Sequence, residues 1–328
     1  MKAIRVEDDD QNSLVWADRP RPDYGPDEVL VAVRATAVNR ADLLQRRGLY
    51  PPPEGASDIL GLELAGRIAR VGDQVDDWSV GDRVCALVPG GGYAEFAAVP
   101  ADMLLEVPEG LPLVEAGGIP EVFYTAYLNI RLEAQQSPGD HILVHAGASG
   151  VGTAAIQLCQ LFDSPVYATA SGPKLPFLRN LGVEAAIDRH EEDFVARIDQ
   201  ETDGEGVDII LDPVAGDYLP RNIELLAEQG RLVLIGLLGG TSGELPMARL
   251  LTRRLRIIGS VLRSRSPDEK IEITRAFRRE VWPHLGDRTL EPVVDRTFSI
   301  EQAEEAHALL GSNETIGKVV LKVGGDDR

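Results

Sequence analysis

From about residue 124 onward, strand-like segments alternate with helix-like segments, and this alternation constrains the fold more than any other feature of the chain. The part of the chain before this point is rich in strands instead. Regular alternation of strands and helices is typical of a doubly wound parallel sheet. We expect strands at 141–145, 166–170, 185–188, 207–212, 231–236 and within 255–262, and helices at 150–162, 174–181, 191–200 and 218–228.

The first third of the chain has closely spaced strand segments with Gly-Asp turn signals between them. This pattern predicts a small barrel or sandwich. A last strand at 316–322 alternates like a half-buried antiparallel strand and has no place in the parallel sheet, so we expect it to return to the first domain. The early strands are expected at 29–38, 64–71, 83–88 and 93–99, and the domains at 1–123, 124–262 and 263–328, the last returning to the first.

A glycine-rich segment joins the first strand of the second domain to its first helix. It reads His145-Ala146-Gly147-Ala148-Ser149-Gly150-Val151-Gly152. In this position Gly147 suits a tight turn, Gly152 lets the helix pack closely on the strand, and the first helical amides can hold a pyrophosphate. The general pattern has glycine where Ser149 stands, so the segment is a variant of a dinucleotide-binding loop.

The end of the second strand indicates which dinucleotide is bound. A site for NAD places an acid there to accept the ribose 2′-hydroxyl. Here the strand is followed by Ser171-Gly172-Pro173-Lys174, which supplies a hydroxyl and a cation but no carboxylate. This composition favours the 2′-phosphate of NADPH. The alternative is that Lys174 is an ordinary solvated lysine.

Composition excludes some functions. The net charge of -20 argues against nucleic acid as a partner, because phosphate binding needs clustered cations. Only five of the 33 basic residues are lysine. Acidic excess with scarce lysine favours adaptation to high salt, where screening relieves self-repulsion, and the alternative is an acidic protein from a GC-rich genome.

The two cysteines, Cys85 and Cys159, lie in apolar segments and are too few for a disulfide framework or a four-cysteine zinc site. We expect both to be small buried residues. The chain has no apolar run long enough to span a membrane, and its first residues alternate like a strand and lack the apolar core of a signal peptide. We therefore expect a cytoplasmic protein.

Separated motifs along nearly the whole chain carry a family resemblance. They are Asn39-Arg40-Ala41-Asp42-Leu43-Leu44-Gln45, Gly55-Ala56-Ser57-Asp58-Ile59-Leu60-Gly61-Leu62-Glu63, Pro89-Gly90-Gly91-Gly92, Ile119-Pro120-Glu121, the run from His145 to Leu158, Leu262-Arg263-Ser264-Arg265, and Ile316-Gly317-Lys318-Val319-Val320-Leu321. With these motifs the chain resembles the zeta-crystallin-like NADPH:quinone oxidoreductases of the medium-chain dehydrogenase/reductase superfamily. Within them it is most similar to the subgroup that includes the tumour-suppressor-inducible quinone oxidoreductase.

The resemblance implies a GroES-like β-barrel catalytic domain interrupted by a Rossmann domain, with cofactor and substrate in the cleft between them. It also implies a homodimer in which the strand near 255–262 pairs across the two-fold axis. The alcohol dehydrogenases of this superfamily hold a catalytic zinc with cysteine and histidine. The positions that match those ligands are Asn39, Leu62 and Glu121, which offer no thiolate or imidazole, so we expect no metal.

The resemblance also implies the site residues. Asn39 and Tyr50 are the expected hydrogen-bond donors to the acceptor oxygen, with Tyr50 acting alternatively as an apolar lid. Asp42 either orients Asn39 or caps the local helix. Arg189 stands where family members carry a tyrosine that touches the 2′-phosphate, and it either binds that phosphate or faces solvent. The expected cofactor-binding residues are Thr125, Gly147, Ala148, Ser149, Gly150, Val151, Gly152, Ser171, Lys174, Arg189, Asp212, Gly236 and Leu237.

Three functions remain open at this point. The first is hydride transfer from NADPH to a quinone, independent of zinc. The second is NADPH-dependent reduction of an enone or enal, which needs the same hydride at an electron-poor carbon. The third is a non-catalytic, crystallin-like NADPH-binding protein. No residue pattern in the chain identifies the small-molecule acceptor.

Overall fold

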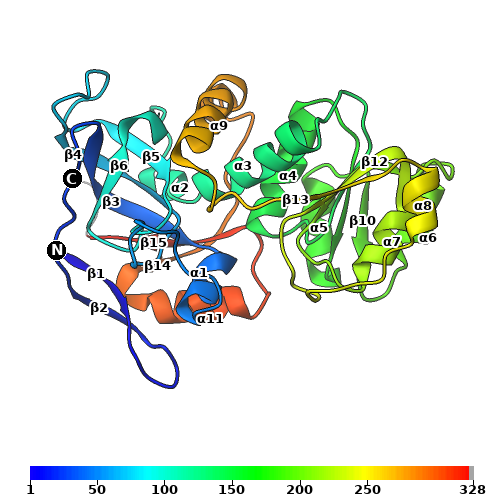
Figure 1. Ribbon diagram of the computed structural model, residues 1–328, viewed down its shortest axis with the longest axis horizontal. Helices are drawn as coiled ribbons and strands as arrows, with labels where there is room; N and C mark the ends of the chain where they lie inside the picture. Colours follow the sequence, from blue (N-terminus) through cyan, green and yellow to red (C-terminus); the bar gives the residue numbers. More distant parts are fainter. Residues whose placement is uncertain (325–328) are drawn as a thin grey trace. The chain divides into compact units, whose positions relative to one another are not determined.

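The structure is a computed structural model that describes residues 1–324, and the chain divides into two units. Unit 1 is Met1–Tyr124 with Arg263–Arg328, and unit 2 is Thr125–Leu262 (Figure 1). The first boundary lies one residue after the expected end of the first domain at 123. The expected third segment, 263–328, includes residues 325–328, which lie outside the described part of the chain.

Unit 2 is built on a six-stranded parallel sheet with helices packed against it (Figure 1). The strand order β10-β9-β8-β11-β12-β13 confirms the predicted doubly wound sheet, because the chain moves outward from β8 first to one side and then to the other. The strands are β8 (Ile142–Val144), β9 (Val166–Ala170), β10 (Ala185–Asp188), β11 (Val207–Asp212), β12 (Leu226–Leu234) and β13 (Arg256–Gly259). The main helices are α4 (Gly150–Leu161), α5 (Leu175–Asn180), α6 (Phe194–Glu201), α7 (Tyr218–Leu225) and α8 (Met247–Thr252).

Two helices of unit 2 differ from the expected ranges by three residues at one end. Helix α6 begins at Phe194 and not at residue 191, because Asp193 caps it by accepting a hydrogen bond from the Val195 amide at 3.0 Å. Helix α7 ends at Leu225 and not at residue 228. Leu226 is fully buried and already pairs with Val207 of β11, so the chain has turned into strand β12 at this point.

Unit 1 contains a mostly antiparallel sheet, in which the described strands follow the order β14-β15-β3-β4-β5-β7 and β6 pairs with β3. The expected strand at 93–99 begins later, since residues 93–95 pair with the N-terminal strand instead: the Ile4 amide donates to the Tyr93 carbonyl and the Glu95 amide to the Lys2 carbonyl. The strands are β1 (Lys2–Val6), β2 (Leu14–Asp18), β3 (Glu28–Val38), β4 (Glu63–Val71), β5 (Arg83–Leu87), β6 (Phe96–Pro100), β7 (Leu104–Glu106), β14 (Val294–Ser299) and β15 (Lys318–Lys322).

Strand β15 corrects one prediction. It pairs antiparallel with β3, as expected, but also parallel with β14, so it is an internal strand and not a half-buried one. Four of its five residues are buried. The polar residue Lys318 makes the sequence alternate, but its side chain is only 4% exposed because it forms an ion pair inside the unit. A pattern of alternation therefore cannot distinguish a buried lysine from a solvated one.

The helices of unit 1 come from segments between and after these strands. They are α1 (Arg40–Arg46), α2 (Leu113–Ala116), α3 (Pro120–Tyr127, which runs on into unit 2), α9 (Pro267–Glu280), α10 (Trp282–Gly286) and α11 (Ala303–Gly311). Cys85 in β5 and Cys159 in α4 are free thiols with no exposed surface, which confirms the prediction that both are buried. Among residues 1–324, no helix has the length and apolar character needed to cross a membrane.

Candidate functional site

The glycine-rich segment of unit 2 lies between the carboxyl end of β8 and the start of α4. Ser149 caps the helix, and its hydroxyl accepts a hydrogen bond from the Gly152 amide at 3.0 Å. The amides of Gly150 and Val151 belong to the first turn, where N–H groups have no partner within the helix. These amides, at the positive end of the helix dipole, suit a bound phosphate.

The shape of this loop depends on two glycines, which have no side chain. A Cβ atom on Gly152 would lie 2.5 Å from the carbonyl oxygens of Ala146 and Gly147, and one on Gly147 would lie 2.7 Å from the Ala168 side chain. Ala146 itself adopts a φ of 52°. The loop therefore forms the close backbone approach that a dinucleotide pyrophosphate needs, and the residues present fit such a cofactor.

A buried hydrogen-bonded chain lies beneath the loop. His145 contacts the Thr169 hydroxyl at 3.0 Å and the Asn222 side-chain oxygen at 2.8 Å. Asn222 in turn donates to Asp212 at 2.9 Å, and Asp212 also accepts the amides of Val214 and Ala215. The carboxylate of Asp212, an expected cofactor contact, is thus fully buried and shapes the turn after β11. Burial lowers the pKa of His145.

The residues expected around the 2′-phosphate lie at one edge of the sheet. Asp188 pairs with Ala170, and the Arg189 amide donates to the Ala170 carbonyl at 2.9 Å, so the ends of β9 and β10 lie side by side. Ser171 and Lys174 are near this edge, and Arg189 is exposed. The structure adds an acid that sequence reasoning missed, because a Cβ on Gly172 would meet the Asp188 carboxylate at 2.5 Å.

The remaining expected cofactor contacts lie elsewhere in unit 2. Gly236 lies so close to Pro213 that a Cβ would approach the Pro213 carbonyl oxygen to 2.8 Å. Leu237 follows it and is 57% exposed. Thr125 lies in α3, where its carbonyl accepts a hydrogen bond from Asn129 at 2.7 Å.

Unit 1 contains a separate, buried cluster of polar side chains. The pairing of Val319 with Val38 brings Lys318 of β15 beside Asn39, the residue that follows β3. The Lys318 ammonium lies 2.7 Å from a Glu63 carboxylate oxygen and 2.6 Å from the Asn39 amide oxygen, and the Asn39 amide donates to the same Glu63 oxygen at 2.9 Å. All three side chains are more than nine-tenths buried.

This geometry changes the role expected of Asn39. Its side-chain amide donates to Glu63 and, at 3.3 Å, to the Ala37 carbonyl, while its oxygen accepts from Lys318. No hydrogen of this amide is left for an acceptor molecule. Asn39 is placed to hold the ion pair between Glu63 and Lys318, and not as a free donor.

Asp42, in the first turn of α1, matches the capping alternative. Its carboxylate accepts the backbone amides of Asn39 at 2.8 Å and Gly61 at 3.0 Å, and the Tyr93 hydroxyl lies at 3.4 Å. These contacts fix the start of the helix and the turn before β4. Burial raises the pKa of Asp42 to about 6, against the opposite effect of the two amides.

Glu121, at the start of α3, belongs to the same cluster and was not predicted as a site residue. Its backbone amide donates to the second Glu63 oxygen at 3.0 Å. Burial, followed by the negative charge of Glu63, raises the pKa of Glu121 to about 8. In the sequence this position stands out only as a lost zinc ligand, and no local pattern links residue 121 to residues 63 and 318.

Tyr50 lies beside this cluster. The Arg263 guanidinium packs 5.2 Å from the centre of its ring and donates to its carbonyl oxygen at 3.3 Å. Burial raises the pKa of the Tyr50 phenol, and so does the charge of Glu121. Arg263 is also held by Gln45 at 2.6 Å and by the Pro89 carbonyl at 2.9 Å. Tyr50 is therefore packed against Arg263 and lies within the electric field of an acid.

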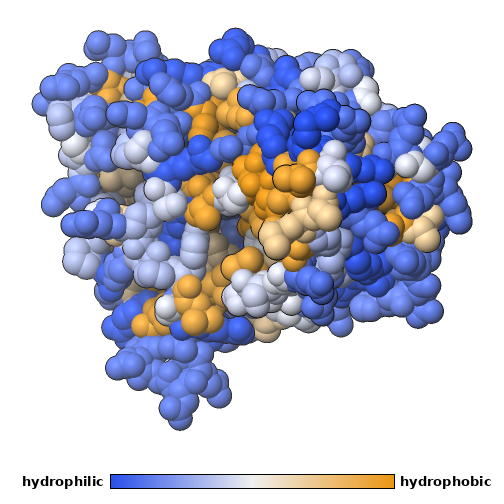
Figure 2. All heavy atoms as spheres, turned by 45° about the vertical axis from the view of Figure 1, so that its right-hand side comes forward, coloured by the Kyte–Doolittle hydropathy of each residue, from blue (hydrophilic) through white to orange (hydrophobic). Residues whose placement is uncertain are grey.

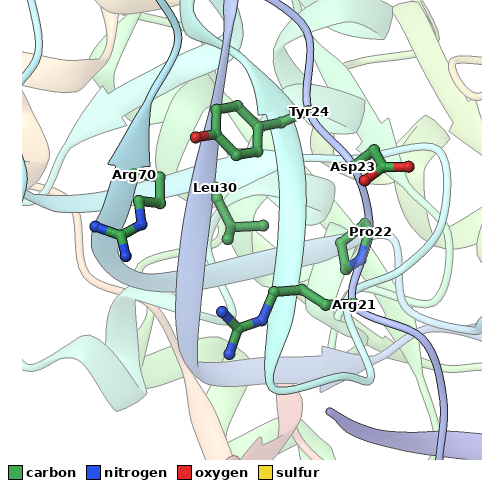
Figure 3. Close-up of a pocket in the computed structure, with 6 residues that line it drawn as sticks. All are labelled: Arg21, Pro22, Asp23, Tyr24, Leu30 and Arg70. Atoms are coloured by element: carbon green, nitrogen blue, oxygen red, sulfur yellow. The ribbon is translucent and has the colours of Figure 1, made fainter.

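A further pocket of unit 1, of about 270 Å³, contains none of the expected site residues (Figure 3). Figure 3 shows Arg21 and Arg70 on either side of Leu30, with Tyr24 nearby. The Arg21 guanidinium packs over the Phe96 ring, 3.9 Å from the ring centre. Across residues 1–324, no group of three or more His, Cys, Asp or Glu side chains has an arrangement that could hold a metal ion.

Comparison with known proteins gives two family matches. Residues 25–109 match the alcohol dehydrogenase GroES-like domain, and residues 150–278 match the family described as zinc-binding dehydrogenase. Among curated proteins, the phthioceranic/hydroxyphthioceranic acid synthase of Mycobacterium tuberculosis is 32% identical over 320 residues. These residues make up 96% of this chain but 15% of that relative, so the chain spans a small part of the protein it matches.

Solved structures match over almost their whole length. An NAD-dependent alcohol dehydrogenase is 30% identical with a TM-score of 0.86, covering 99% of this chain and 100% of that one. A quinone oxidoreductase of Pseudomonas syringae pv. Tomato and the enoyl reductase JamJ are each 27% identical with a TM-score of 0.87, covering 98% of this chain and 99% of theirs. The chain therefore belongs to the medium-chain dehydrogenase/reductase superfamily, whose fold serves nicotinamide-dependent oxidoreductases.

Proposed function

We propose that the protein is an NADPH-dependent reductase of electron-poor carbonyl compounds, of the zeta-crystallin-like type, that acts on quinones or enones without zinc. The observation that carries this proposal is the loop between β8 and α4, where helix amides and two close glycine contacts form a cradle for a pyrophosphate. The similarity to a quinone oxidoreductase and to an enoyl reductase supports the two acceptor classes equally.

The nicotinamide, when bound, supplies a hydride to the acceptor. The residues of this chain bind and orient the reactants. The first-turn amides of α4 hold the pyrophosphate, and the Asp212 network fixes the turn that follows β11. In unit 1, the buried ion pair of Glu63 and Lys318 holds the polar groups around it in place. Hydride transfer to a quinone would leave a hydroquinone anion and hydride transfer to an enone an enolate, and each takes up one proton to complete the reduction.

The activity is tested by NADPH oxidation with an ortho-quinone, with an enone, and with no acceptor. We expect turnover that depends on an acceptor. Tight NADPH binding with no turnover of any acceptor in the panel would favour the non-catalytic, crystallin-like alternative, and absence of NADPH binding would overturn the proposal.

The choice of NADPH over NADH is part of the proposal and depends on Ser171, Lys174 and Arg189. We expect NADPH to bind at least about tenfold tighter than NADH, or about 1.4 kcal/mol. The variants Lys174→Ala and Arg189→Ala should reduce this preference with little change in NADH affinity. The negative charge of Asp188 at the same edge of the sheet opposes the binding of a 2′-phosphate. Equal affinities for NADPH and NADH would overturn the proposed preference for NADPH.

We also propose that no zinc is needed, although one matching family is described by zinc binding. Purified protein should contain no stoichiometric zinc by elemental analysis, and chelators should leave its activity unchanged. One zinc ion per chain, lost together with activity, would refute this part of the proposal.

A homodimer is proposed on the edge of the unit 2 sheet. Strand β13 is an edge strand of this sheet, and within residues 1–324 no strand pairs with its outer side. Near it in sequence, Met247, Leu251 and Val261 are 72%, 78% and 50% exposed. The face drawn in Figure 2 is mostly hydrophilic, with hydrophobic side chains in several places. Edge pairing would cover such a strand. Sedimentation should give the mass of a dimer, and Ile257→Pro in β13 should give monomers.

A further inference from the structure

His145 is a buried titratable residue that the proposed reaction does not use. It follows β8 at the start of the phosphate loop (residues 145–152), and it is 1% exposed. The rings of Phe194 and Tyr218 meet its imidazole edge to face, each with its centre 4.9 Å from the imidazole centre. Burial lowers the pKa of His145, although the charge of Asp212 acts in the opposite direction. These surroundings favour the neutral imidazole.

The partners of the imidazole determine which of its nitrogens carries the proton. The Asn222 amide nitrogen donates to the Asp212 carboxylate at 2.9 Å, so the Asn222 amide oxygen is the atom that faces His145. An amide oxygen can only accept, so the imidazole donates to it from Nε2, at 2.8 Å. The other nitrogen, Nδ1, then accepts the hydroxyl proton of Thr169 at 3.0 Å. His145 is therefore neutral in this network, with its proton on Nε2.

The network crosses neighbouring strands at the carboxyl edge of the sheet. Thr169 belongs to β9, His145 follows β8 and Asp212 ends β11, and these three strands are consecutive in the strand order. Thr169 holds the phosphate loop twice, because its hydroxyl contacts His145 and its carbonyl accepts the Gly147 amide at 2.9 Å. Each of the four side chains of the network, Asn222 included, is at most 1% exposed. The strand ends cannot shift without breaking a buried hydrogen bond.

At its other end the network shapes two further loops. The Asp212 carboxylate accepts the amides of Val214 at 2.6 Å and Ala215 at 3.0 Å, which forms the turn after β11. The Val214 carbonyl in turn accepts the Gly239 amide at 2.6 Å, so the loop after β12 rests on this turn. Gly236, an expected cofactor contact, belongs to the same loop. The network thus joins the phosphate loop to a second loop at which the cofactor is expected.

We propose that His145 is a positioning residue for the cofactor, which fixes the phosphate loop and the loop after β12 relative to each other. This role rests on the proposed function, because the two loops would bind different parts of one NADPH molecule, the pyrophosphate and the nicotinamide riboside. A ligand that contacts both loops binds more tightly when they are already held in place, since less freedom is lost on binding. Because it is buried, His145 acts through the backbone of these loops and does not touch the cofactor.

His145→Phe keeps a ring and removes both hydrogen bonds. We expect it to bind NADPH about tenfold more weakly or worse in calorimetric titration, since two bonds of a buried network are lost. The matched control is His141→Phe. His141 precedes β8, and its Nδ1 lies 2.9 Å from the Tyr167 hydroxyl of β9, so it has a similar contact at the opposite edge of the same strands. This control should leave the NADPH affinity unchanged.

A fragment of the cofactor distinguishes support of one loop from coupling of two loops. Adenosine 2′-phosphate 5′-diphosphate contains the pyrophosphate and lacks the nicotinamide riboside. His145→Phe should weaken the binding of this fragment less than that of NADPH, because the fragment does not use the second loop. Equal losses for the fragment and for NADPH would overturn the coupling.

Thr169 provides a test that does not depend on the folding of His145→Phe. Thr169→Val replaces the hydroxyl by a methyl group of similar size, and Thr169→Ser keeps the hydroxyl. The NADPH affinity should fall in Thr169→Val and stay near the wild-type value in Thr169→Ser. Equal affinities in wild type and both variants would overturn the positioning role.

The position of the imidazole proton is measured without cofactor, so it separates this inference from the proposed function. Protein labelled with ¹⁵N-histidine is studied by NMR, and the imidazole signals missing from His145→Phe are assigned to His145. We expect a proton on Nε2 and none on Nδ1. A proton on Nδ1 at neutral pH would overturn the network even if NADPH binds. The expected proton position in a wild-type protein that does not bind NADPH would instead overturn the proposed function, and the positioning role with it, while leaving the network intact.

Discussion

The two polar regions of the molecule are built from different chemical groups. The loop of unit 2 uses backbone amides and the space left by glycines, all within residues 145–152. The cluster of unit 1 uses side chains from four separate segments, with Asn39 and Lys318 in contact although they are 279 residues apart. Backbone amides do not titrate, whereas the cluster holds carboxyl groups with raised pKa values, Asp42 and Glu121. The protein groups of the first region therefore keep their charge as pH changes, and those of the second do not.

The difference also concerns stability. The loop is exposed or half-buried at Ser149 and Gly150, so changes there affect a ligand more than the core. The cluster is buried, and each charge in it depends on its partner. Changes in the cluster should therefore affect folding strongly, and changes in the loop should affect binding selectively.

The largest effect is expected from Lys318→Met, which keeps the length of the side chain and removes its charge. Glu63 would be left buried without its cation, and removing one partner of a buried ion pair costs about 3 to 5 kcal/mol. Urea unfolding followed by circular dichroism measures this loss. The control Lys322→Met changes an exposed lysine of the same strand and should cost little.

The double variant Lys318→Met/Glu63→Gln sharpens this test. It removes both charges, so it should lose less stability than Lys318→Met alone, since no uncompensated charge remains. A single variant that is as stable as wild type would show that the ion pair is not formed in solution.

The next effect concerns binding. In Gly152→Ala the added Cβ meets two carbonyl oxygens at 2.5 Å, so the loop must move and NADPH affinity should fall by about tenfold or more. The control Gly259→Ala adds a Cβ that has no neighbour within 4 Å and should leave the affinity unchanged. Calorimetric titration with NADPH measures both. Equal NADPH affinity in the two variants would mean that the loop does not bind the cofactor.

One contribution to the pH dependence of stability should come from Glu121. The folded state holds the pKa of Glu121 at about 8, above its ordinary value of 4.5. Between these values the folded state binds more protons than the unfolded state, so the contribution of Glu121 to stability is fully present below about pH 4.5 and is lost as pH rises through 8. Melting curves should show this decline in wild type and in Glu109→Gln, which changes an exposed glutamate of the same unit. The decline should be shallower in Glu121→Gln, and an unchanged slope there would contradict the assignment.

The smallest and least local effect is that of salt. With a net charge of -20, the carboxylates of the chain repel one another, and high ionic strength screens this repulsion. The melting temperature should rise from low salt toward molar salt. A melting temperature that stays flat would favour an acidic protein with no adaptation to salt.

The sequence predicts the two regions unequally, for a physical reason. Strand and helix alternation and the glycine pattern are local, so the doubly wound sheet and the loop could be predicted from consecutive residues. Lys318 and Glu63 meet only because β15 pairs with β3 beside β4, and pairing between distant strands leaves no local pattern. Asn39 and Asp42 were found through family likeness, but their hydrogen-bond partners, and hence their roles, required the structure.

Isotope tracing is the decisive experiment for a nicotinamide-dependent reduction. NADPH carrying deuterium at C4 of the nicotinamide is incubated with the protein and an enone in ordinary water, and the product is analysed by mass spectrometry. With the transferred position labelled, we expect one deuterium at the β-carbon and none at the α-carbon, where the proton comes from the protein or solvent. A saturated product without deuterium from either face of labelled NADPH would contradict hydride transfer from the nicotinamide, and no saturated product at all would exclude the enone as an acceptor.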